Sequence, residues 1–282
     1  MTNSKRLAHL ITGSGPRVVV VHGFTQSKAS WEFIAPQLGR SHEVIAIDLP
    51  DHSGSTDVHA SDLDDAAALV GEVGGTSTYI GYSLGGRVCL TLALRSPELV
   101  RRLVLIGATP GLLTEEEREA RRAADNTLAD RIDPPDGSSL GMGLAAFLAE
   151  WLDGPLFSHL NPEQANVAAR LSNTTAGLAR SLRTTGTGTQ VPSHDQLSEL
   201  SMPVLLVAGA NDVRFSAIAR AMAAAIGANA SVAIVDGVGH AVPFEAPLAF
   251  CDVVEEFLAR TDEGSAERIA STSKSDTDRQ QN

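Results

Sequence analysis

Short apolar runs that are rich in β-branched residues recur along the chain, and most are followed by segments whose apolar residues have helical spacing. The apolar runs have the length of buried strands and lie at residues 18–21, 44–47, 78–80, 103–106, 204–207 and 231–235. The helical segments lie at residues 32–38, 66–73, 84–95, 217–226 and 247–259. Because strands that are apolar on both sides need cover on both sides, this alternation predicts an α/β fold with a mostly parallel central sheet flanked by helices.

The strand pattern stops between Pro110 and Ser201. This segment consists of helical patterns interrupted at Pro134-Pro135, at Gly154-Pro155 and by the stretch TTGTGT. We interpret it, at about residues 111–200, as a helical cap insertion that lies over the sheet as a lid. The alternative is a structural excursion that makes no contact with substrate.

A length of 282 residues with 43% hydrophobic composition suits one large domain that carries an insertion, here residues 1–260. Polar residues dominate after Arg260, so we expect residues 261–282 to form a disordered C-terminal tail. The two cysteines, Cys89 and Cys251, lie in apolar helical patterns and are expected to be buried thiols rather than a disulfide.

Acidic side chains outnumber basic ones by 34 to 22, which gives a formal net charge of −12. Such a charge repels nucleic acid and anionic membrane surfaces, so neither is an expected partner. A basic pocket remains compatible with this charge, because salt screens surface fields over about 10 Å. No stretch approaches the ~20 apolar residues of a membrane span, so we expect a cytoplasmic protein without membrane insertion.

The segment Gly81-Tyr82-Ser83-Leu84-Gly85 follows a predicted strand and opens a predicted helix, which is the context of a G-x-S-x-G nucleophile elbow. The glycines let strand and helix approach closely enough to hold Ser83 in a strained turn with its hydroxyl exposed. The new helix directs backbone N–H groups toward negative charge that forms beside the serine. We therefore predict an α/β-hydrolase fold with Ser83 as the reactive hydroxyl. The alternative is an inert serine in a chance match.

A serine hydroxyl needs a base, and in this fold the acid and the histidine follow the serine in chain order. His240 lies just past the last predicted strand, so we assign it as the base. His22 precedes Ser83, and we interpret it as a loop-shaping residue beside an oxyanion hole. The other histidines are expected to be surface or hydrogen-bonded loop residues: His9, His42, His52, His59, His159 and His194.

Asp212 lies at the end of the penultimate predicted strand and ahead of His240, which fits the acid that orients the base. Asp236 is the rival, but it precedes His240 closely in the same connection, and a lined-up geometry is then awkward. Asp48 also follows a strand, and we expect it to cap the loop DLPDHSGS. The oxyanion hole is expected from the backbone N–H groups of Leu84 and Phe24.

Arginines supply the candidate anion-binding groups. Arg87 lies one helical turn after Ser83 and is placed either to bind an anion or to pair with an acid. Arg118 shares a predicted helix face with Arg121 and Arg122. On these residues alone, a solvated face held by pairs such as Glu117 with Arg121 is the favoured interpretation.

Seven stretches of the chain resemble the 2-succinyl-6-hydroxy-2,4-cyclohexadiene-1-carboxylate synthases, lyases of menaquinone biosynthesis in the α/β-hydrolase superfamily. They are VHGFTQSKASW, GYSLGGR, ATPGLLTEEEREARRAAD, AFLAEWLDGPLF, ARLSNTTAGLARSLRTTGTGTQ, GANDVRF and VGHAVPFEAP. The likeness runs from about His22 to Leu258 and includes the insertion, where hydrolases of this fold usually diverge.

The resemblance implies an enzyme that eliminates pyruvate from a small polycarboxylate, 2-succinyl-5-enolpyruvyl-6-hydroxy-3-cyclohexene-1-carboxylate, with no metal and no cofactor. By the same resemblance, Ser83, Asp212 and His240 match the family triad, with the serine acting as a base. Five further residues match positions that line the family's anion pocket: Tyr82, Arg87, Arg118, Trp151 and Arg170.

Two departures from the family pattern concern loops. The stretch DLPDHSGS carries Asp51 and Ser53 in place of glycines, and Pro243 stands where many relatives have histidine. Neither departure touches the triad, but both leave the local loop shape open.

Two other classes of function share these features. A serine hydrolase of esters or of C–C bonds uses the same triad and oxyanion hole. A non-catalytic ligand-binding module keeps the fold without the chemistry. We rank the lyase first, the hydrolase second and the binding module third.

Overall fold

The computed structural model describes residues 6–135 and 141–261, and its core is a seven-stranded sheet in the order β1-β3-β2-β4-β5-β6-β7. The strands are β1 (His9–Thr12), β2 (Arg17–Val21), β3 (Glu43–Ile47), β4 (Ser77–Tyr82), β5 (Val100–Ile106), β6 (Val204–Gly209) and β7 (Ala230–Val235). Within the described residues, β1 pairs antiparallel with β3 and the other strand pairs are parallel. The predicted α/β fold with a mostly parallel sheet is confirmed.

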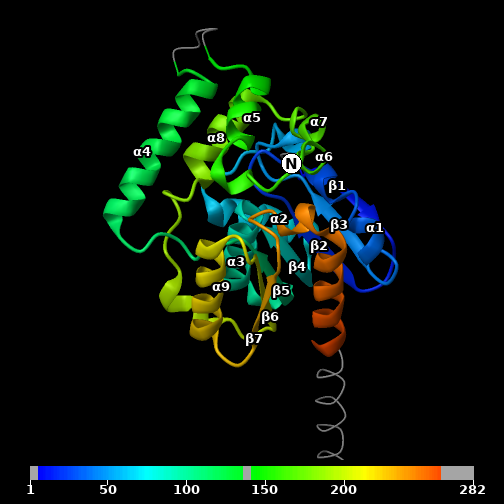
Figure 1. The fold of residues 1–282 in the computed structure, drawn as a ribbon. Helices are drawn as coiled ribbons and strands as arrows, with labels where there is room; N and C mark the ends of the chain where they lie inside the picture. Colours follow the sequence, from blue (N-terminus) through cyan, green and yellow to red (C-terminus); the bar gives the residue numbers. More distant parts are fainter. Residues whose placement is uncertain (1–5, 136–140, 262–282) are drawn as a thin grey trace, which may run out of the picture.

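Helices cover both faces of this sheet (Figure 1). The helices of the main domain are α1 (Ala35–Leu38), α2 (Leu63–Gly74), α3 (Leu84–Arg95), α9 (Val213–Ile226), α10 (Val242–Glu245) and one at residues 247–261. Val19 and Val21 of β2 pack with α2, α3 and α9, whereas Val18 and Val20 pack with α1 and the last helix. Alternate side chains of β2 therefore pack into the hydrophobic cores on opposite faces of the sheet, because successive side chains of a strand point to opposite faces.

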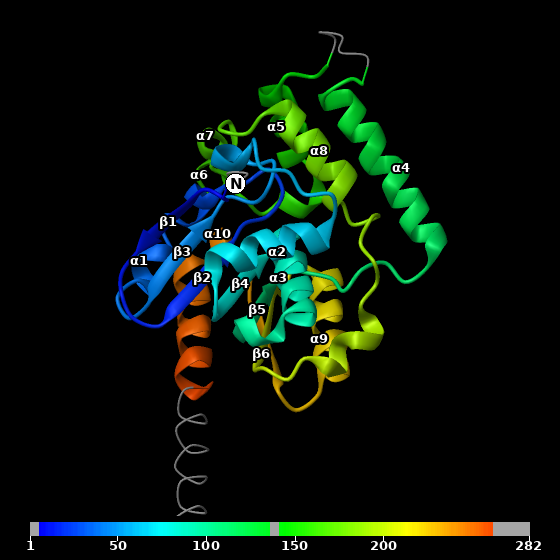
Figure 2. The ribbon, with the colours of Figure 1, turned by 180° about the vertical axis from the view of Figure 1, so that it is seen from behind.

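A cap of helices lies beyond one end of the sheet in both views (Figures 1 and 2). Its helices are α4 (Glu115–Ile132), α5 (Leu144–Leu152), α6 (Pro162–Ala165), α7 (Val167–Arg170) and α8 (Thr175–Thr185). The cap has a small core of its own, in which Phe147 and Leu148 of α5 pack with Leu178 and Leu182 of α8. Phe24 of the main domain packs against this core, so the cap is anchored on the loop that follows β2.

Short 3₁₀ helices complete the described structure. They are η1 (Lys28–Trp31), η2 (Ser53–Ser55), η3 (Pro97–Leu99), η4 (Pro155–Phe157) and η5 (His194–Glu199). The helix predicted at residues 32–38 is shorter than expected, because α1 begins only at Ala35. Pro36 lies in the first turn of α1, where its missing N–H costs nothing, and a helix started earlier would have needed that donor.

Two further sequence predictions can be compared with the structure. The predicted tail falls on residues 262–282, outside the described residues, except for Thr261, which is helical. Cys89 and Cys251 are free and buried, as predicted. In the described part of the chain, no helix is both long enough and apolar enough to span a membrane.

Candidate active site

Ser83 stands at the sharp turn between β4 and α3. Its backbone is left-handed, with φ 51° and ψ −109°, a conformation that a side-chain-bearing residue adopts only under strain. The turn is possible because the residues two positions before and two positions after Ser83 are glycines, which have no Cβ. A Cβ added to Gly81 would lie 2.3 Å from the Gly85 carbonyl oxygen, and one added to Gly85 would lie 2.3 Å from the Val21 carbonyl oxygen.

His240 lies in the loop after β7, and its Nδ1 lies 2.8 Å from Oδ2 of Asp212. Asp212 caps α9, and its Oδ1 accepts a hydrogen bond of 3.1 Å from the Phe215 N–H. Burial acts to raise the pKa of Asp212, but the hydrogen bonds from His240 and Phe215 outweigh it and leave the pKa below its ordinary value. An ionised Asp212 holds the proton of the imidazole on Nδ1, so Nε2 remains free to act as a base.

Ser83 and His240 line the same cavity. Among the described residues the serine hydroxyl has no hydrogen bond to the imidazole, and such bonds often tighten only when substrate binds. The imidazole has little room to swing away on one side, since a Cβ on Gly107 would lie 2.8 Å from its Cε1. Phe215 and Tyr82 flank the ring, with ring centroids 4.6 Å and 5.5 Å from that of His240.

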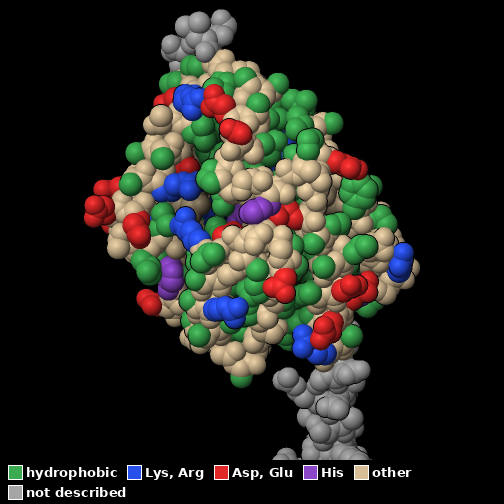
Figure 3. All heavy atoms as spheres, in the orientation of Figure 1, with side chains coloured by type: hydrophobic (Ala, Val, Ile, Leu, Met, Phe, Trp, Pro, Cys, Tyr) green, Lys and Arg blue, Asp and Glu red, His purple; other side chains and the backbone are tan. Residues whose placement is uncertain are grey.

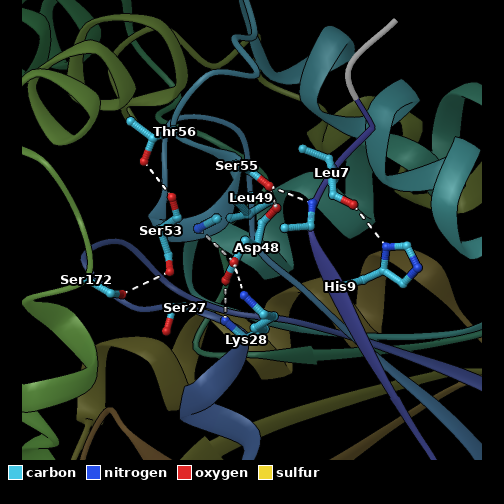
Figure 4. A network of polar contacts seen from close by, with 12 residues as sticks. Leu7, His9, Ser27, Lys28, Asp48, Leu49, Ser53, Ser55, Thr56 and Ser172 are labelled. Carbon is cyan, nitrogen blue, oxygen red and sulfur yellow. Dashed lines mark hydrogen bonds and ion pairs between the residues drawn. The ribbon is translucent and has the colours of Figure 1, made fainter. Parts of the chain in front are cut away.

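The two rival aspartates lie elsewhere. Asp236 is exposed in the turn that follows β7. Asp48 is fully buried and accepts hydrogen bonds from the Lys28 N–H at 2.7 Å, from Lys28 Nζ at 2.5 Å and from the Gly54 N–H at 3.0 Å. Figure 4 shows this carboxylate at the centre of the loop that it organises. The predicted loop-capping role of Asp48 agrees with these bonds.

Phe24 and Leu84, whose amides are predicted to form the oxyanion hole, line the same cavity as Ser83. Neither amide donates a hydrogen bond to a protein acceptor within the described residues. His22 shapes the loop before Phe24, because its Nδ1 lies 2.8 Å from the Gly23 carbonyl and its Nε2 accepts from the Leu49 N–H at 3.0 Å. Burial, with a smaller contribution from His52, lowers the pKa of His22 to about 3, so the ring is neutral.

His52 is more buried than the sequence suggested. Its side chain is fully inaccessible, and its ring centroid lies 5.1 Å from that of His22 and 6.0 Å from that of Phe24. Nδ1 bonds the Pro50 carbonyl at 2.8 Å, as expected of a loop residue, while Nε2 has no partner in the described residues. The His52 ring therefore packs against the loop that contains Phe24.

The cavity between the main domain and the cap has a volume of about 680 Å³, within the range of sites for small molecules. Figure 3 shows basic side chains beside a hollow between the cap and the main domain. The polar and aromatic residues that line the cavity include Phe24, Gln26, Tyr82, Ser83, Arg87, Glu117, Arg121, Trp151, Phe157, Arg170, Ser181, Arg214, Phe215 and His240.

Arg87 and Arg170 are buried cations in this cavity wall, 7% and 2% exposed. Burial lowers the pKa of each guanidinium to about 10, which still leaves both charged at neutral pH. Nη1 of Arg87 has no partner in the described residues. Arg170 donates from Nε to the Ala165 carbonyl at 2.7 Å and from Nη1 to the Thr25 hydroxyl, neither of which neutralises its charge.

The structure does not place Arg118 with the cavity-lining residues, which corrects the prediction from resemblance. Arg118 pairs with Glu115 at 2.6 Å and donates to the carbonyls of Leu112 and Leu113. Arg121, one helical turn further along α4, lines the cavity instead. Glu117 and Ala120 of α4 line the cavity together with Arg121.

Tyr82 and Trp151, also predicted from the resemblance, both line the cavity. The Tyr82 hydroxyl and the Trp151 Nε1 are buried without a hydrogen-bond partner among the described residues. Burial raises the pKa of Tyr82, so it remains a neutral phenol that can donate a hydrogen bond. Two buried donors without acceptors favour a ligand that brings acceptor oxygens.

Arg214 is a cavity-lining residue that the sequence did not reveal. It is the second residue of α9 and follows Asp212 closely, so its place in the cavity wall results from the position of that helix. Its guanidinium carbon lies 5.8 Å from the centroid of the Phe215 ring.

Asp51 and Ser53, which replace glycines of the family pattern, both adopt positive φ, 66° and 44°. The loop thus keeps a glycine-like backbone, and the side chains contact the cap instead. Asp51 pairs with Arg180 of α8 at 3.0 Å, and Ser53 bonds Ser172 at 2.9 Å (Figure 4). Pro243 lies in the first turn of α10, where proline is favoured.

No group of three His, Cys, Asp or Glu side chains that could hold a metal ion occurs in the part of the chain that the structure describes.

Comparison with known proteins identifies relatives of this chain. The sequence profile of the α/β-hydrolase fold family matches residues 16–247. A Bacillus subtilis (strain 168) protein that bears the name of a 2-succinyl-6-hydroxy-2,4-cyclohexadiene-1-carboxylate synthase is 36% identical over 276 residues, covering 92% of this chain and 97% of that protein. A synthase of the same name from Serratia proteamaculans is 31% identical over 86% of this chain and 93% of its own length.

Solved structures agree with the fold. The structure of MenH from S. aureus superposes with a TM-score of 0.80 at 26% identity, covering 90% of this chain and 98% of that one. A thermophilic esterase from Thermogutta terrifontis superposes with a TM-score of 0.75 at 23% identity, covering 90% of this chain and 93% of that one, which bears on the fold alone.

Proposed function

The chain belongs to the family of 2-succinyl-6-hydroxy-2,4-cyclohexadiene-1-carboxylate synthases within the α/β-hydrolase fold, and we propose that it catalyses the synthase reaction of menaquinone biosynthesis. In this reaction pyruvate is eliminated from 2-succinyl-5-enolpyruvyl-6-hydroxy-3-cyclohexene-1-carboxylate. The observation that carries the proposal is the pair of buried guanidinium groups, Arg87 and Arg170, which share a cavity with Ser83 and form no salt bridge with an acid among the described residues.

The names of substrate and product define the bonds that change. The substrate has one ring double bond, between carbons 3 and 4, whereas the product has double bonds that begin at carbons 2 and 4. The proton on carbon 2 therefore leaves, its electron pair forms the first new double bond, and the old double bond moves by one position. The bond between carbon 5 and the ether oxygen breaks, and the departing enolpyruvate takes up a proton to become pyruvate.

Ser83 is the proposed base for the proton on carbon 2, while its own proton passes to Nε2 of His240. Carbon 2 carries the succinyl carbonyl, so its loss of a proton places negative charge on that carbonyl oxygen. The amides of Phe24 and Leu84 are the proposed donors to this oxygen, a type of contact worth a few kcal/mol of barrier. The reaction then needs no acyl-enzyme.

The arginines give the site its selectivity for a polycarboxylate. Arg87 and Arg170 are each proposed to hold one carboxylate, because a guanidinium in a low-dielectric wall binds a carboxylate bidentately. Such positioning fixes the reacting C–H near Ser83 and can supply several kcal/mol. Arg87→Ala and Arg170→Ala are therefore expected to impair use of the polycarboxylate far more than hydrolysis of a neutral ester.

The proposal is tested by mixing the purified protein with the enolpyruvyl substrate and following pyruvate release together with the diene absorbance. Equal molar amounts of both products are expected, and Ser83→Ala should abolish both. If neither signal appears at micromolar enzyme, the assigned reaction is wrong.

A serine hydrolase acting on an ester or C–C bond of a small anionic substrate is the second candidate. It is favoured by the same strained elbow and the same free amides, which serve acyl transfer equally well. The two candidates differ in whether Ser83 becomes covalently modified during turnover.

A further inference from the structure

The carboxylate of Glu245 bridges the two backbone amides that flank His240. Its Oε2 accepts a hydrogen bond of 2.6 Å from the Gly239 N–H, and its Oε1 accepts one of 2.8 Å from the Ala241 N–H. Hydrogen bonds from amides to a carboxylate are about twice as strong as those between neutral groups. A single side chain therefore holds the backbone directly before and directly after the histidine.

The one-turn helix α10 brings Glu245 to this position. Ala241 is the N-cap of α10 and Glu245 is its last residue, so one helical turn places the two side by side. The Glu245 N–H donates to the Ala241 carbonyl at 2.9 Å, which closes that turn. Pro243 lies in the first turn and has no N–H that could compete for the carboxylate. The Glu245 side chain can therefore fold back to the loop that precedes the helix.

The imidazole of His240 depends on this loop for its direction. Its Nδ1 is held by Asp212 at 2.8 Å, but that contact fixes only one side of the ring. The backbone that carries the ring, at residues 236–241, is neither helix nor strand. Glu245 is not among the residues that line the cavity, so it acts on the ring through the backbone and not through substrate.

The cap contacts the same loop. Nε2 of Gln164, in α6, donates to the Glu245 carbonyl at 3.2 Å. The ring of His159, which precedes α6, lies so close to Gly239 that a Cβ added to the glycine would be 2.6 Å from His159 Cδ2. The position of the cap and the position of the loop of His240 are therefore linked through Glu245 and Gly239.

We infer that Glu245 is a positioning residue for the synthase reaction: it fixes the loop of His240 so that Nε2 can receive the Ser83 proton, an inference that rests on the proposed function. Loss of both hydrogen bonds in Glu245→Ala is expected to lower kcat by about 100-fold, because misplacement of a catalytic group by about 1 Å can cost that much. KM should change by less than about twofold, since Glu245 does not line the cavity.

The matched variants are Glu245→Gln and Glu255→Gln. Glutamine keeps the size of the side chain, but its amide has one acceptor oxygen and one NH₂ donor, so it can accept from only one of the two N–H groups. We expect kcat of Glu245→Gln to fall by about tenfold, between wild type and Glu245→Ala. Glu255 is exposed on the helix at residues 247–261, and its replacement should leave kcat unchanged. Wild-type kcat in Glu245→Gln, or an increase in KM at constant kcat, would overturn the inference.

Labelling of Ser83 by a small fluorophosphonate separates this inference from the proposed reaction. The Ser83 oxygen attacks phosphorus, fluoride leaves, and the serine proton passes to His240, so the labelling rate reports the same proton transfer without the synthase substrate. Intact-mass measurements should show labelling about tenfold slower in Glu245→Gln than in Glu255→Gln. Equal rates would reject the role of Glu245. If wild type is labelled but releases no pyruvate, the proposed reaction is wrong, and the labelling rates still decide the role of Glu245.

Discussion

Nδ1 of His240 lies 2.8 Å from Oδ2 of Asp212, although the two residues are 28 positions apart in the chain. The contact forms because Asp212 caps α9 after β6, and His240 follows the neighbouring strand β7. The carboxyl ends of these parallel strands bring Asp212 and His240 to one edge of the sheet, where both His240 and Ser83 line the cavity.

Asp212→Asn is expected to lower kcat for pyruvate release by roughly 10⁴-fold, as in other triads, because an amide no longer keeps the imidazole proton on Nδ1. Asp236→Asn makes the same change in an exposed turn after β7 and should leave kcat unchanged. Steady-state pyruvate release measures both. If the two variants lost activity equally, Asp212 would not be the orienting acid.

Asp125→Asn is expected to stabilise the protein at neutral pH. Burial raises the pKa of Asp125 above its ordinary value, and its Oδ2 has no partner among the described residues. A carboxyl whose pKa is raised by folding stabilises the fold below its unfolded-state pKa, and this contribution is lost as pH rises through the folded value. The ionised carboxylate therefore lowers the free energy of unfolding near pH 7, and the uncharged asparagine avoids this loss.

This advantage should shrink as the pH falls toward about 4, where the aspartate becomes protonated in both states. Urea unfolding of wild type and variant at several pH values measures it. The matched control is Asp130→Asn on the same helix, which breaks only an exposed pair with Arg183 and should change stability by less than about 1 kcal/mol. If Asp125→Asn is less stable than wild type at pH 7, the stabilisation from the ion pair with Arg121 is larger than the cost of burying the carboxylate.

The buried His22 predicts a loss of stability in mild acid. Its pKa is lowered to about 3, chiefly by burial, so the unfolded chain binds a proton near pH 6.5 that the folded protein does not. The stabilising contribution is complete above about pH 6.5 and falls toward pH 3, by up to about 1.4 kcal/mol per pH unit. His22→Gln, whose amide can replace both hydrogen bonds, should reduce this slope by one proton.

Unfolding free energies between about pH 5 and 7.5 provide the measurement for His22→Gln, with His42→Gln, at a partly exposed histidine, as the control. The control should keep the slope of the wild type. An unchanged slope in His22→Gln would mean that His22 is protonated in the folded protein.

The close approach at the elbow predicts that Gly81→Ala destabilises the fold by at least about 2 kcal/mol, because the new Cβ would lie 2.3 Å from a backbone oxygen that cannot move aside. Gly143→Ala is the control, since Gly143 has φ −63° and no atom within 4 Å of an added Cβ. That change should stay within about 0.5 kcal/mol of wild type. Denaturant unfolding of the two variants gives the comparison, and equal stability would contradict the packing at the elbow.

The main strands and the order of Ser83, Asp212 and His240 were predictable, because buried parallel strands leave continuous apolar runs and their carboxyl ends meet at one edge. Strand β1 was not predicted. It is a short edge strand, largely exposed, and its four residues are defined by pairing with β3 rather than by an apolar run. The sequence also could not separate Arg118 from Arg121, since a single helix face contains both and only the packing of α4 on α8 decides which one reaches the cavity.

The position of Arg214 in the cavity wall could not be predicted from the sequence either. An arginine at the start of a helix is ordinary in sequence, and its place in the cavity follows from where α9 lies relative to the cap. The buried state of His52 was missed for a related reason, because burial in a loop depends on the neighbours that the fold supplies, here His22 and Phe24.

The role of Ser83 is tested most directly by intact-mass measurement of the enzyme quenched within the first turnovers of the enolpyruvyl substrate. If Ser83 acts as a base, pyruvate and diene accumulate while the mass of the protein stays that of the unmodified chain. A mass increase that maps to Ser83, that appears as fast as the first product and that disappears when substrate is exhausted would contradict elimination and establish a covalent serine mechanism.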